Sequence, residues 1–581
     1  MGYMIKKLIA NIGVYKKESI ITPLYVTGEV ILDIIIPLVM AMMIDNGIEK
    51  GDTKAILMYG AILFVCAIIA LFFGAMSGRY AAVASAGFAK NLRDQLFVRI
   101  QGFSFSNIDR FSTSSLITRM TTDVTNVQNA YQMIIRLLVR SPLIMIFSLA
   151  MAYSINKDLS LIYLGVVPFL MIGLAAVIYF AHPNFNKVFR IYDKLNNVVQ
   201  ENLQGIRVVK SYVREKHEDE KFKSVSKDIY KTFSKAQSIV AFNNPILQFA
   251  VYTCMLLISW LGAKFVVGST LTTGELVSMF TYTMQILMSL NMLSMVFVIV
   301  LIARTSAERI TEVLSEESDL KNNADPLYEI ADGSVRFNDV CFSYANDLEK
   351  LALMHANMEI KSGEVIGIVG GTGSSKSTLV QLIPRLYDVT KGSVEVGGHD
   401  VRNYDLKSLR DQVSMVLQNN VLFTGSIKEN LRWGNEEATD EDLIRVCKIA
   451  QADSFIQEFP DKYDTMLSQG GNNVSGGQKQ RLCIARALLK KPKILILDDS
   501  TSAVDTKTDR LIREGMRQEI PGTTTFIIGQ RVSSIQDSDR IIVMDKGLID
   551  AIGTHDELLA SNQIYQEVYE SQEKGFGEEN A

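Results

Sequence analysis

A glycine-rich octapeptide in this chain has the residue types needed to hold phosphate groups. It reads Gly370-Gly371-Thr372-Gly373-Ser374-Ser375-Lys376-Ser377, follows the apolar run Val365–Val369 and precedes a helical pattern that includes Thr378. Backbone N–H groups of such a loop, together with the N-terminus of the next helix, attract anions. The strand–loop–helix context separates a phosphate loop from a chance match. We therefore assign residues 370–378 to nucleotide binding.

Three polar side chains are expected to act on the bound nucleotide and its metal. Lys376 should contact the β- and γ-phosphates, and the Ser377 hydroxyl should ligate Mg²⁺. Further along, the buried-strand pattern Ile494–Leu497 ends in Asp498, whose carboxylate offers Mg²⁺ a hard oxygen ligand. The sequence thus predicts a site for ATP and Mg²⁺.

The residue before Lys376 departs from the usual phosphate loop. Such loops carry glycine there, whereas this chain has Ser375. A Cβ atom costs little if the backbone φ angle is negative and more if φ is positive. We expect ATP binding to survive this change.

A second glycine-containing segment lies between the phosphate loop and Asp498. It reads Val474-Ser475-Gly476-Gly477-Gln478 and opens a helical pattern. Taken alone it would be read as a turn, but a hydroxyl and glycine amides at a helix N-terminus also form an anion site. In this order, the two segments and Asp498-Asp499 resemble the nucleotide-binding domain of ABC transporters.

The resemblance implies roles that the residues alone do not establish. Ser475, Gly476, Gly477 and Gln478 would face the γ-phosphate bound to the opposite subunit. Gln418 would reach the metal and the attacking water, and Tyr344 would stack on the adenine. Read without the resemblance, Tyr344 would be a sheet residue.

Two positions suggest that hydrolysis at this chain's own site is slow. By resemblance, Asp499 occupies the position of a catalytic Glu and Gln530 that of a switch His. Asp is shorter than Glu by about 1.5 Å, and a retraction of this order can cost roughly 10²-fold in rate. An amide can donate a hydrogen bond but cannot exchange a proton as imidazole does. The alternative, in which Asp499 replaces Glu with modest loss, stays open.

Other segments bear on how two such chains would cooperate. Residues 468–471 read Ser-Gln-Gly-Gly where exporters often have Gly-Glu-Arg-Gly, so the details of coupling between the nucleotide-binding domain and the membrane helices stay open. By contrast, Ser502–Asp505 match the loop that contacts the partner subunit in the family. An intact signature beside a weakened catalytic pair resembles heterodimeric ABC exporters. The resemblance implies a distinct partner half that bears Glu and His at the catalytic positions.

The N-terminal half must supply the membrane elements. Hydrophobic residues make up 48% of the 581 residues and concentrate in this half. A span needs about 20 apolar residues, and no small-residue cleavage site follows the first run, so it is read as a span rather than a secretory signal. Six spans are predicted, at about 19–44, 55–80, 133–153, 159–180, 246–267 and 276–302.

Long polar segments, residues 85–130 and 181–244, separate some of these spans and are rich in Lys and Arg. Basic loops remain in the cytoplasm, so both termini are predicted to be cytoplasmic and the chain a multi-pass protein of the cytoplasmic (inner) membrane. Their helical periodicity indicates that the spans continue as helices. Resemblance to the exporter fold implies transverse helices at about Phe103–Phe111 and Tyr212–Glu218; solvated helical loops are the alternative.

The fold class is therefore an α-helical transmembrane domain of six spans with long cytoplasmic extensions, followed by an α/β nucleotide-binding domain with a mainly parallel sheet. The predicted domains are 1–315 for the membrane part, 316–332 for an acidic linker and 333–581 for the nucleotide-binding part.

Two carboxylates lie inside the first predicted span, where charges are costly and mark polar pathways. Glu29 and Asp33 are four residues apart and share one helical face. They could pair with Arg136 and Arg140, which lie at matching depth in the third span, or they could line a cavity that attracts cationic cargo.

The sixth span is rich in methionine, a side chain that adapts to varied apolar partners. Family resemblance places this helix on the translocation path, and ordinary helix packing is the alternative. The candidate pathway residues at helical spacing are Met288, Met292 and Met295.

Composition limits the classes of ligand and partner that the chain is expected to bind. A net charge of −4 gives no sign of nucleic-acid binding. The five cysteines and five histidines are scattered, which predicts free thiols and argues against a zinc or iron site. The resemblance implies ATP-driven export, across the bilayer, of an amphipathic small molecule or lipid. A peptide exporter subunit and an ATP-gated sensor without cargo flux stay open as alternatives.

Overall fold

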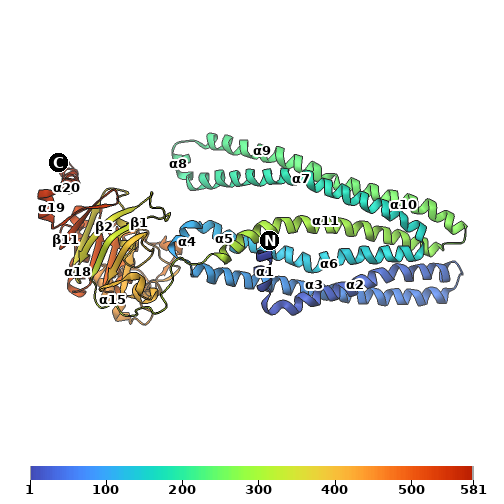
Figure 1. Cartoon of the computed structure of the whole chain (residues 1–581), viewed down its shortest axis with the longest axis horizontal. Helices are drawn as coiled ribbons and strands as arrows, with labels where there is room; N and C mark the ends of the chain where they lie inside the picture. Colours follow the sequence, from blue (N-terminus) through green and yellow to red (C-terminus); the bar gives the residue numbers. More distant parts are fainter. Residues whose placement is uncertain (1, 579–581) are drawn as a thin grey trace. The chain divides into compact units, whose positions relative to one another are not determined.

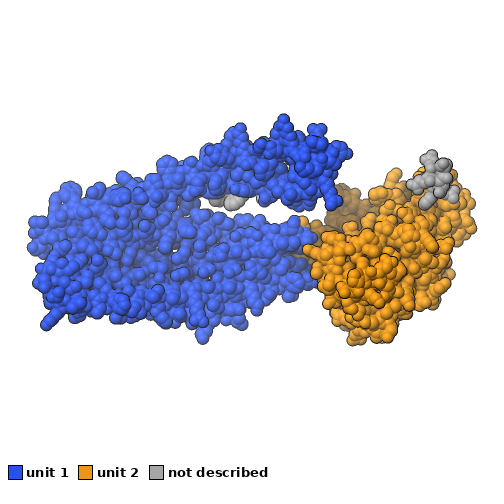
Figure 2. Space-filling view, turned by 180° about the vertical axis from the view of Figure 1, so that it is seen from behind, with its two compact units in different colours: residues 1–101, 113–316 blue, residues 102–112, 317–581 orange. Residues whose placement is uncertain are grey.

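The structure, a computed structural model, describes residues 2–578 and contains two compact units. The first unit comprises residues 1–101 and 113–316, and the second comprises residues 102–112 and those from 317 onward (Figure 2). The boundary between the two units lies after Glu316 and therefore falls at the start of the predicted linker, residues 316–332. The short segment 102–112, assigned to the membrane half from sequence, belongs to the second unit.

The first unit is entirely helical in its regular structure (Figure 1). Among the described residues, six helical segments are long and apolar enough to cross a membrane, which confirms the predicted number of spans. The helices are α1 (Gly2–Ala10), α2 (Lys16–Met43), α3 (Thr53–Gln101), α5 (Thr113–Thr118), α6 (Val124–Ile155), α7 (Lys157–Gln204), α8 (Ile206–Ser211), α9 (Glu215–Ala241), α10 (Asn243–Val267) and α11 (Thr273–Ser315).

Several of these helices extend far beyond the length of a membrane span. Helix α3 has 49 residues and α7 has 48, so each is about 70 Å long at 1.5 Å per residue, more than twice the thickness of a hydrocarbon core. The predicted helical continuation of the spans is thus confirmed.

The structure corrects the position of one loop-tip helix. The sequence predicted a transverse helix over about Tyr212–Glu218, but the short helix is α8, Ile206–Ser211, which begins six residues earlier. Gly205 ends α7 and precedes α8, and Val213 adopts a left-handed φ of 52° that breaks the helix before α9 begins at Glu215. The other predicted tip helix is present as α4 (Phe105–Arg110), within the second unit.

The second unit is built on a six-stranded sheet in the order β12-β11-β3-β10-β9-β6. Five of its strands are parallel and β12 is antiparallel, which confirms the mainly parallel sheet. A four-stranded antiparallel sheet, β2-β1-β4-β5, was not predicted. The strands are β1 (Val335–Phe342), β2 (Leu353–Ile360), β3 (Val365–Gly370), β4 (Lys391–Val396), β5 (His399–Asp400), β6 (Val413–Val416), β7 (Gly425–Ser426), β8 (Met466–Leu467), β9 (Ile494–Asp498), β10 (Thr524–Ile528), β11 (Arg540–Asp545) and β12 (Leu548–Gly553).

Both faces of the six-stranded sheet are covered. Because side chains alternate along a strand, Ile494 and Ile496 of β9 join one hydrophobic cluster while Leu495 and Leu497 join another. The parallel arrangement brings the carboxyl ends of β3, β9 and β10 to the same edge. The helices of this unit, besides α4, are α12 (Lys376–Gln381), α13 (Leu406–Gln412), α14 (Ile427–Arg432), α15 (Asp440–Ile449), α16 (Asp453–Glu458), α17 (Gly476–Leu489), α18 (Thr506–Glu519), α19 (His555–Ser561) and α20 (Gln563–Glu578).

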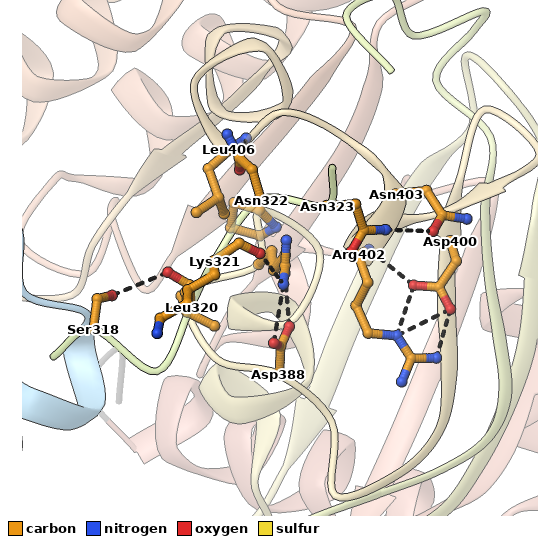
Figure 3. A network of polar contacts seen from close by, with 12 residues as sticks. Ser318, Leu320, Lys321, Asn322, Asn323, Asp388, Asp400, Arg402, Asn403 and Leu406 are labelled. Carbon is orange, nitrogen blue, oxygen red and sulfur yellow. Dashed lines mark hydrogen bonds and ion pairs between the residues drawn. The ribbon is translucent and has the colours of Figure 1, made fainter. Parts of the chain in front are cut away.

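The predicted linker lies along the second unit and is held there by hydrogen bonds (Figure 3). The Asn322 side chain donates to Asp405 at 2.6 Å and accepts from the Leu406 backbone N–H at 3.0 Å. The Asn323 amide donates to the Asn403 side chain at 3.0 Å. The segment after α11 is therefore attached to the second unit along its length.

Candidate functional site

The phosphate loop leaves the central strand β3 and enters α12, as the sequence predicted. A Cβ atom on Gly370 would lie 2.2 Å from the Met544 carbonyl oxygen, so only glycine fits there. Gly373 has a φ of +82°, and a Cβ atom on Gly371 or Gly373 would have open space around it. The loop thus presents bare backbone on one side, as a close approach to a ligand requires.

Ser375 has a strained backbone in this loop. Its φ of 69° and ψ of 28° are left-handed, and its side chain does not cap α12. A non-glycine residue in this region costs of order 1–3 kcal/mol. The sequence left the sign of the Ser375 φ angle open. In the structure φ is positive, which is the conformation that costs more for a residue with a Cβ atom.

Lys376 folds back over the loop. Its ammonium donates to the carbonyl oxygens of Gly370 and Gly371, both at 2.9 Å. Burial lowers the pKa of Lys376, and the charges of Asp498 and Asp499 oppose this shift. A cation held among loop carbonyls is placed where anionic phosphate oxygens would compete for it.

Ser377 and Asp498 meet at the end of β9. The Ser377 hydroxyl donates to Asp498 Oδ1 at 3.0 Å, and Asp498 is 3% exposed. Burial raises the pKa of Asp498, while the hydrogen bond from Ser377 lowers it. A hydroxyl and a carboxylate at this spacing are the hard oxygen donors that suit Mg²⁺.

Asp499, Gln530 and Gln418 converge beside this pair. The Gln530 amide Nε2 donates to Asp499 Oδ2 at 2.8 Å. Burial raises the pKa of Asp499, and hydrogen bonds from Gln530 and Gln418 oppose the shift. Asp499 has a left-handed φ of 51°, and its N–H donates to the Ile528 carbonyl at 3.1 Å. Three residues chosen from sequence are therefore brought together at one strand edge.

Tyr344 lies two residues beyond the end of β1, so it is a loop residue and not a sheet residue. Its phenol is 2.9 Å from Thr378 Oγ1 in α12. Its ring packs edge-on to Tyr387, with centroids 5.3 Å apart. Burial raises the pKa of Tyr344. This arrangement puts a half-exposed aromatic ring next to the phosphate loop.

Comparisons with known proteins agree with this geometry. The family model described as ABC transporter transmembrane region matches residues 20–290, and the model described as ABC transporter matches residues 353–502. The "Uncharacterized ABC transporter ATP-binding protein YfiB" of Bacillus subtilis (strain 168) is 35% identical over 576 residues, which cover 99% of each chain. The chain belongs to the ABC transporter family.

Two further comparisons refine the likeness. The "ATP-dependent lipid A-core flippase" of Desulfotalea psychrophila is 34% identical over 523 residues, covering 87% of this chain and 89% of that protein. A solved structure described as a bacterial Atm1-family ABC exporter with ATP bound has a TM-score of 0.83 at 23% identity, covering 96% of this chain and 98% of that chain. This chain therefore has one ABC transporter transmembrane region and one ATP-binding domain, and it is an ATPase coupled to transport.

The signature segment of this ABC transporter begins α17. The Ser475 hydroxyl accepts from the Gln478 N–H at 3.3 Å, and the Gln478 side chain accepts from the Ser475 N–H at 2.9 Å. A Cβ atom on Gly477 would lie 2.8 Å from the Ala503 carbonyl, so the close approach of that loop requires glycine. Within residues 2–578, no hydrogen bond or ion pair joins Ser475, Gly476, Gly477 or Gln478 to the phosphate loop.

A contact that the sequence did not reveal ties the signature helix to the segment after Asp499. Gln480 of α17 accepts from the Ala503 N–H at 3.0 Å and donates to the Ser502 hydroxyl at 3.2 Å. Gln480 is 6% exposed. The sequence signal that could have revealed this contact is the position of Gln480, about one helical turn after the signature glycines. Two hydrogen bonds thus join the signature helix to the loop that follows Asp499.

The carboxylates of the first span are paired. Arg140 of α6 contacts Glu29 at 2.9 Å through one guanidinium nitrogen and Asp33 at 2.9 Å through the other. Of the two arginines matched by depth, only Arg140 serves both carboxylates. Arg136 pairs with neither carboxylate among the described residues, and its guanidinium lies near Gly78 of α3. One Arg140 offsets only one of the two carboxylate charges, so the cluster of Arg140, Glu29 and Asp33 keeps a formal charge of −1.

The methionines of α11 remain accessible in this chain. Met288, Met292 and Met295 are 51%, 42% and 58% exposed, whereas Met279 is fully buried. Ordinary helix packing within this chain therefore explains Met279 and leaves the other three as candidates for a pathway surface.

Proposed function

We propose that this chain is the slow-site half of a heterodimeric ABC exporter. The observation that carries the proposal is the 2.8 Å hydrogen bond from Gln530 to Asp499. It joins the two departures at the catalytic positions, and it occupies the shortened carboxylate with an amide that cannot relay a proton. A carboxylate held in this way is poorly placed to activate water.

The chain's own site still has what ATP binding needs. Residues 370–378 would hold the phosphates, with Lys376 as the cation, and Tyr344 would stack on the adenine. Ser377, Asp498 and Gln418 would hold Mg²⁺, which neutralises phosphate charge in such sites. Ser475–Gln478 would complete the partner's site, where a Glu and a His carry out hydrolysis.

The proposed cargo is an amphipathic small molecule or lipid. The support is the 34% identity to a protein named as a lipid A-core flippase, together with the accessible methionines on α11. The protein would span the cytoplasmic membrane with both termini in the cytoplasm, where the long basic extensions and ATP are found. A peptide cargo remains the second candidate for the same transport activity.

Nucleotide trapping in the assembled exporter tests the slow site. The chain would be co-expressed with a candidate partner half that bears Glu and His at the catalytic positions, then trapped with 8-azido-ATP and vanadate and separated by electrophoresis. We expect trapped label mostly on the partner, whose site this chain's signature completes. Equal labelling of the two chains, or a homodimer of this chain with two fast sites, would overturn the proposal.

Transport must be measured in the same preparation. ATP-dependent movement of a lipid or drug probe in proteoliposomes distinguishes an exporter from a sensor subunit. A sensor would change conformation with nucleotide and move no probe.

A further inference from the structure

The C-terminal helix α20 reaches the loop that carries Gln530, and one of its side chains bonds that loop twice. The Gln572 amide Nε2 donates to the Gln530 carbonyl oxygen at 2.7 Å, and Gln572 Oε1 accepts from the Val532 backbone N–H at 2.8 Å. The three residues lie within the second unit. One planar amide therefore fixes the backbone on both sides of Arg531.

Helix α20 is itself fastened to its neighbour, so Gln572 acts from a fixed support. The Tyr565 phenol oxygen lies 2.7 Å from His555 Nδ1 of α19, and the Tyr565 side chain is fully buried. The Gln566 amide donates to the Leu559 carbonyl oxygen at 2.6 Å. The first turn of α20 is therefore anchored on α19, and the same helix presents Gln572 to the loop.

The loop has two other supports, one on each side of Gln530. Before it, the Gly529 N–H donates to a carbonyl oxygen of β3 at 3.3 Å. After it, the Ser534 hydroxyl donates to Asp509 Oδ2 of α18 at 3.0 Å. Gln530 lies between these supports, and the bond from Gln572 to its carbonyl oxygen holds it there.

The position of this backbone decides what the Gln530 side chain can do. That side chain is exposed and donates to Asp499 at 2.8 Å. Ordering a glutamine side chain costs conformational entropy of about the size that one exposed hydrogen bond returns. The contact with Asp499 therefore persists when the Gln530 backbone is already fixed, and Gln572 supplies two of the bonds that fix it.

We propose that Gln572 is a positioning residue for ATP hydrolysis at this chain's own site: it holds the Gln530–Val532 backbone so that the Gln530 amide stays on Asp499, and α20 thereby slows hydrolysis at that site. The inference rests on the proposed slow site and adds a structural element that sets its rate. Gln572 is 42 residues from Gln530 in the sequence, so no local pattern joins the two.

Nucleotide trapping resolved by chain measures what removal of these two bonds does. The chain, co-expressed with the candidate partner half, would be trapped with 8-azido-ATP and vanadate at several nucleotide concentrations, and the rate of labelling of this chain followed. In Gln572→Ala the rate at saturation should rise about two- to tenfold, the range that corresponds to one net hydrogen bond. The half-saturating concentration should stay within about twofold, because Gln572 bonds the loop rather than residues 370–378.

Matched variants on the same helix separate positioning from folding. Gln572→Glu keeps an acceptor for the Val532 N–H but loses the donor to the Gln530 carbonyl oxygen, so it should raise the rate as Gln572→Ala does. Gln566→Ala removes a glutamine that bonds α19 instead of the loop, and it should leave the rate unchanged. A folding defect cannot raise the rate. An unchanged or lower rate in Gln572→Ala, or an equal rise in Gln566→Ala, would overturn the proposal.

The restored catalytic pair supplies a test of opposite sign. In Asp499→Glu combined with Gln530→His, the imidazole is expected to assist hydrolysis, so a fixed backbone at position 530 should help rather than hinder. Adding Gln572→Ala to that double variant should therefore lower the labelling rate about two- to tenfold. Changes of the same sign in the parent and in the double variant would contradict a positioning role.

These measurements keep the inference apart from the proposed function on which it rests. Equal labelling of the two chains in the parent protein would contradict the slow site. Weak labelling of this chain that Gln572→Ala fails to increase would leave the slow site standing and contradict only the role of Gln572.

Discussion

The Tyr387 phenol donates to Asp109 Oδ2 at 2.7 Å, which ties the nucleotide-binding unit to the loop-tip helix α4 inside one compact unit. Burial raises the pKa of Tyr387, and the hydrogen bond to Asp109 adds to the shift. The Tyr387 ring also packs on Phe105 of α4 and on Tyr344 beside the phosphate loop. A single side chain therefore contacts both the predicted adenine site and the helix that leads back to the spans.

We expect Tyr387→Phe to remove the hydrogen bond to Asp109 while ATP binding is retained. Loss of one hydrogen bond to a charged group should lower the free energy of unfolding by about 1.5–3 kcal/mol. Probe transport per ATP hydrolysed should fall because α4 would follow the nucleotide less closely. Thermal unfolding and a transport-to-hydrolysis ratio in proteoliposomes measure both effects. Asp109→Ala removes the acceptor and should behave in the same way, and an unchanged ratio in both variants would show that this contact carries no coupling.

Restoring the usual catalytic pair should speed hydrolysis at this chain's own site. In Asp499→Glu combined with Gln530→His, the carboxylate regains about 1.5 Å of reach and an imidazole replaces the amide, so site-specific turnover should rise roughly tenfold or more. Azido-nucleotide trapping resolved by chain measures it. Asp499→Asn is the matched control and should abolish residual turnover. No rise in trapping on this chain would mean that other residues limit the site.

Ser375→Gly should relieve the left-handed strain before Lys376. We expect a gain of about 1 kcal/mol in folded stability, the low end of the strain cost because glycine also loosens the unfolded chain. Affinity for a fluorescent ATP analogue should stay equal or improve. Ser375→Ala keeps the Cβ atom and should show no gain. If alanine and glycine behave alike, backbone strain is not what the serine imposes.

Removal of the metal should separate binding from turnover. With EDTA, or in Asp498→Asn, we expect hydrolysis to stop and ATP-analogue affinity to weaken about tenfold or more, because a buried carboxylate that serves the Mg²⁺ shell is lost. Equilibrium titration and phosphate release are the measurements. Asp400→Asn is the matched control, since the Asp400 carboxylate pairs with Arg402 at 2.6 Å in the antiparallel sheet, outside the Ser377–Asp498 pair.

Local patterns predicted the parts of this protein that depend on neighbouring residues. The six spans followed from apolar length, and the β3–loop–α12 unit followed from Val365–Val369 and the glycines after it. Rotation of one helix against another is not a local property, so the sequence matched both Arg136 and Arg140 to α2 by depth, whereas in the structure Arg140 makes both ion pairs and the Arg136 guanidinium lies near Gly78 of α3. The placement of residues 102–112 with the second unit was likewise fixed by a distant partner, Tyr387.

The ion pairs of Arg140 should matter more to folding than to cargo choice. Arg140→Gln leaves Glu29 and Asp33 without a counter-charge inside a span, and loss of one partner of a buried pair costs about 3–5 kcal/mol. We expect a markedly lower unfolding temperature in detergent. The triple variant Arg140→Gln, Glu29→Gln and Asp33→Asn removes every charge and should recover most of the loss, because uncompensated charge rather than the missing contact is what destabilises. If the triple variant is as unstable as Arg140→Gln, the geometry of the cluster matters beyond its charge. If Arg140→Gln alone unfolds normally but takes up cationic probes, the carboxylates line the cargo path after all.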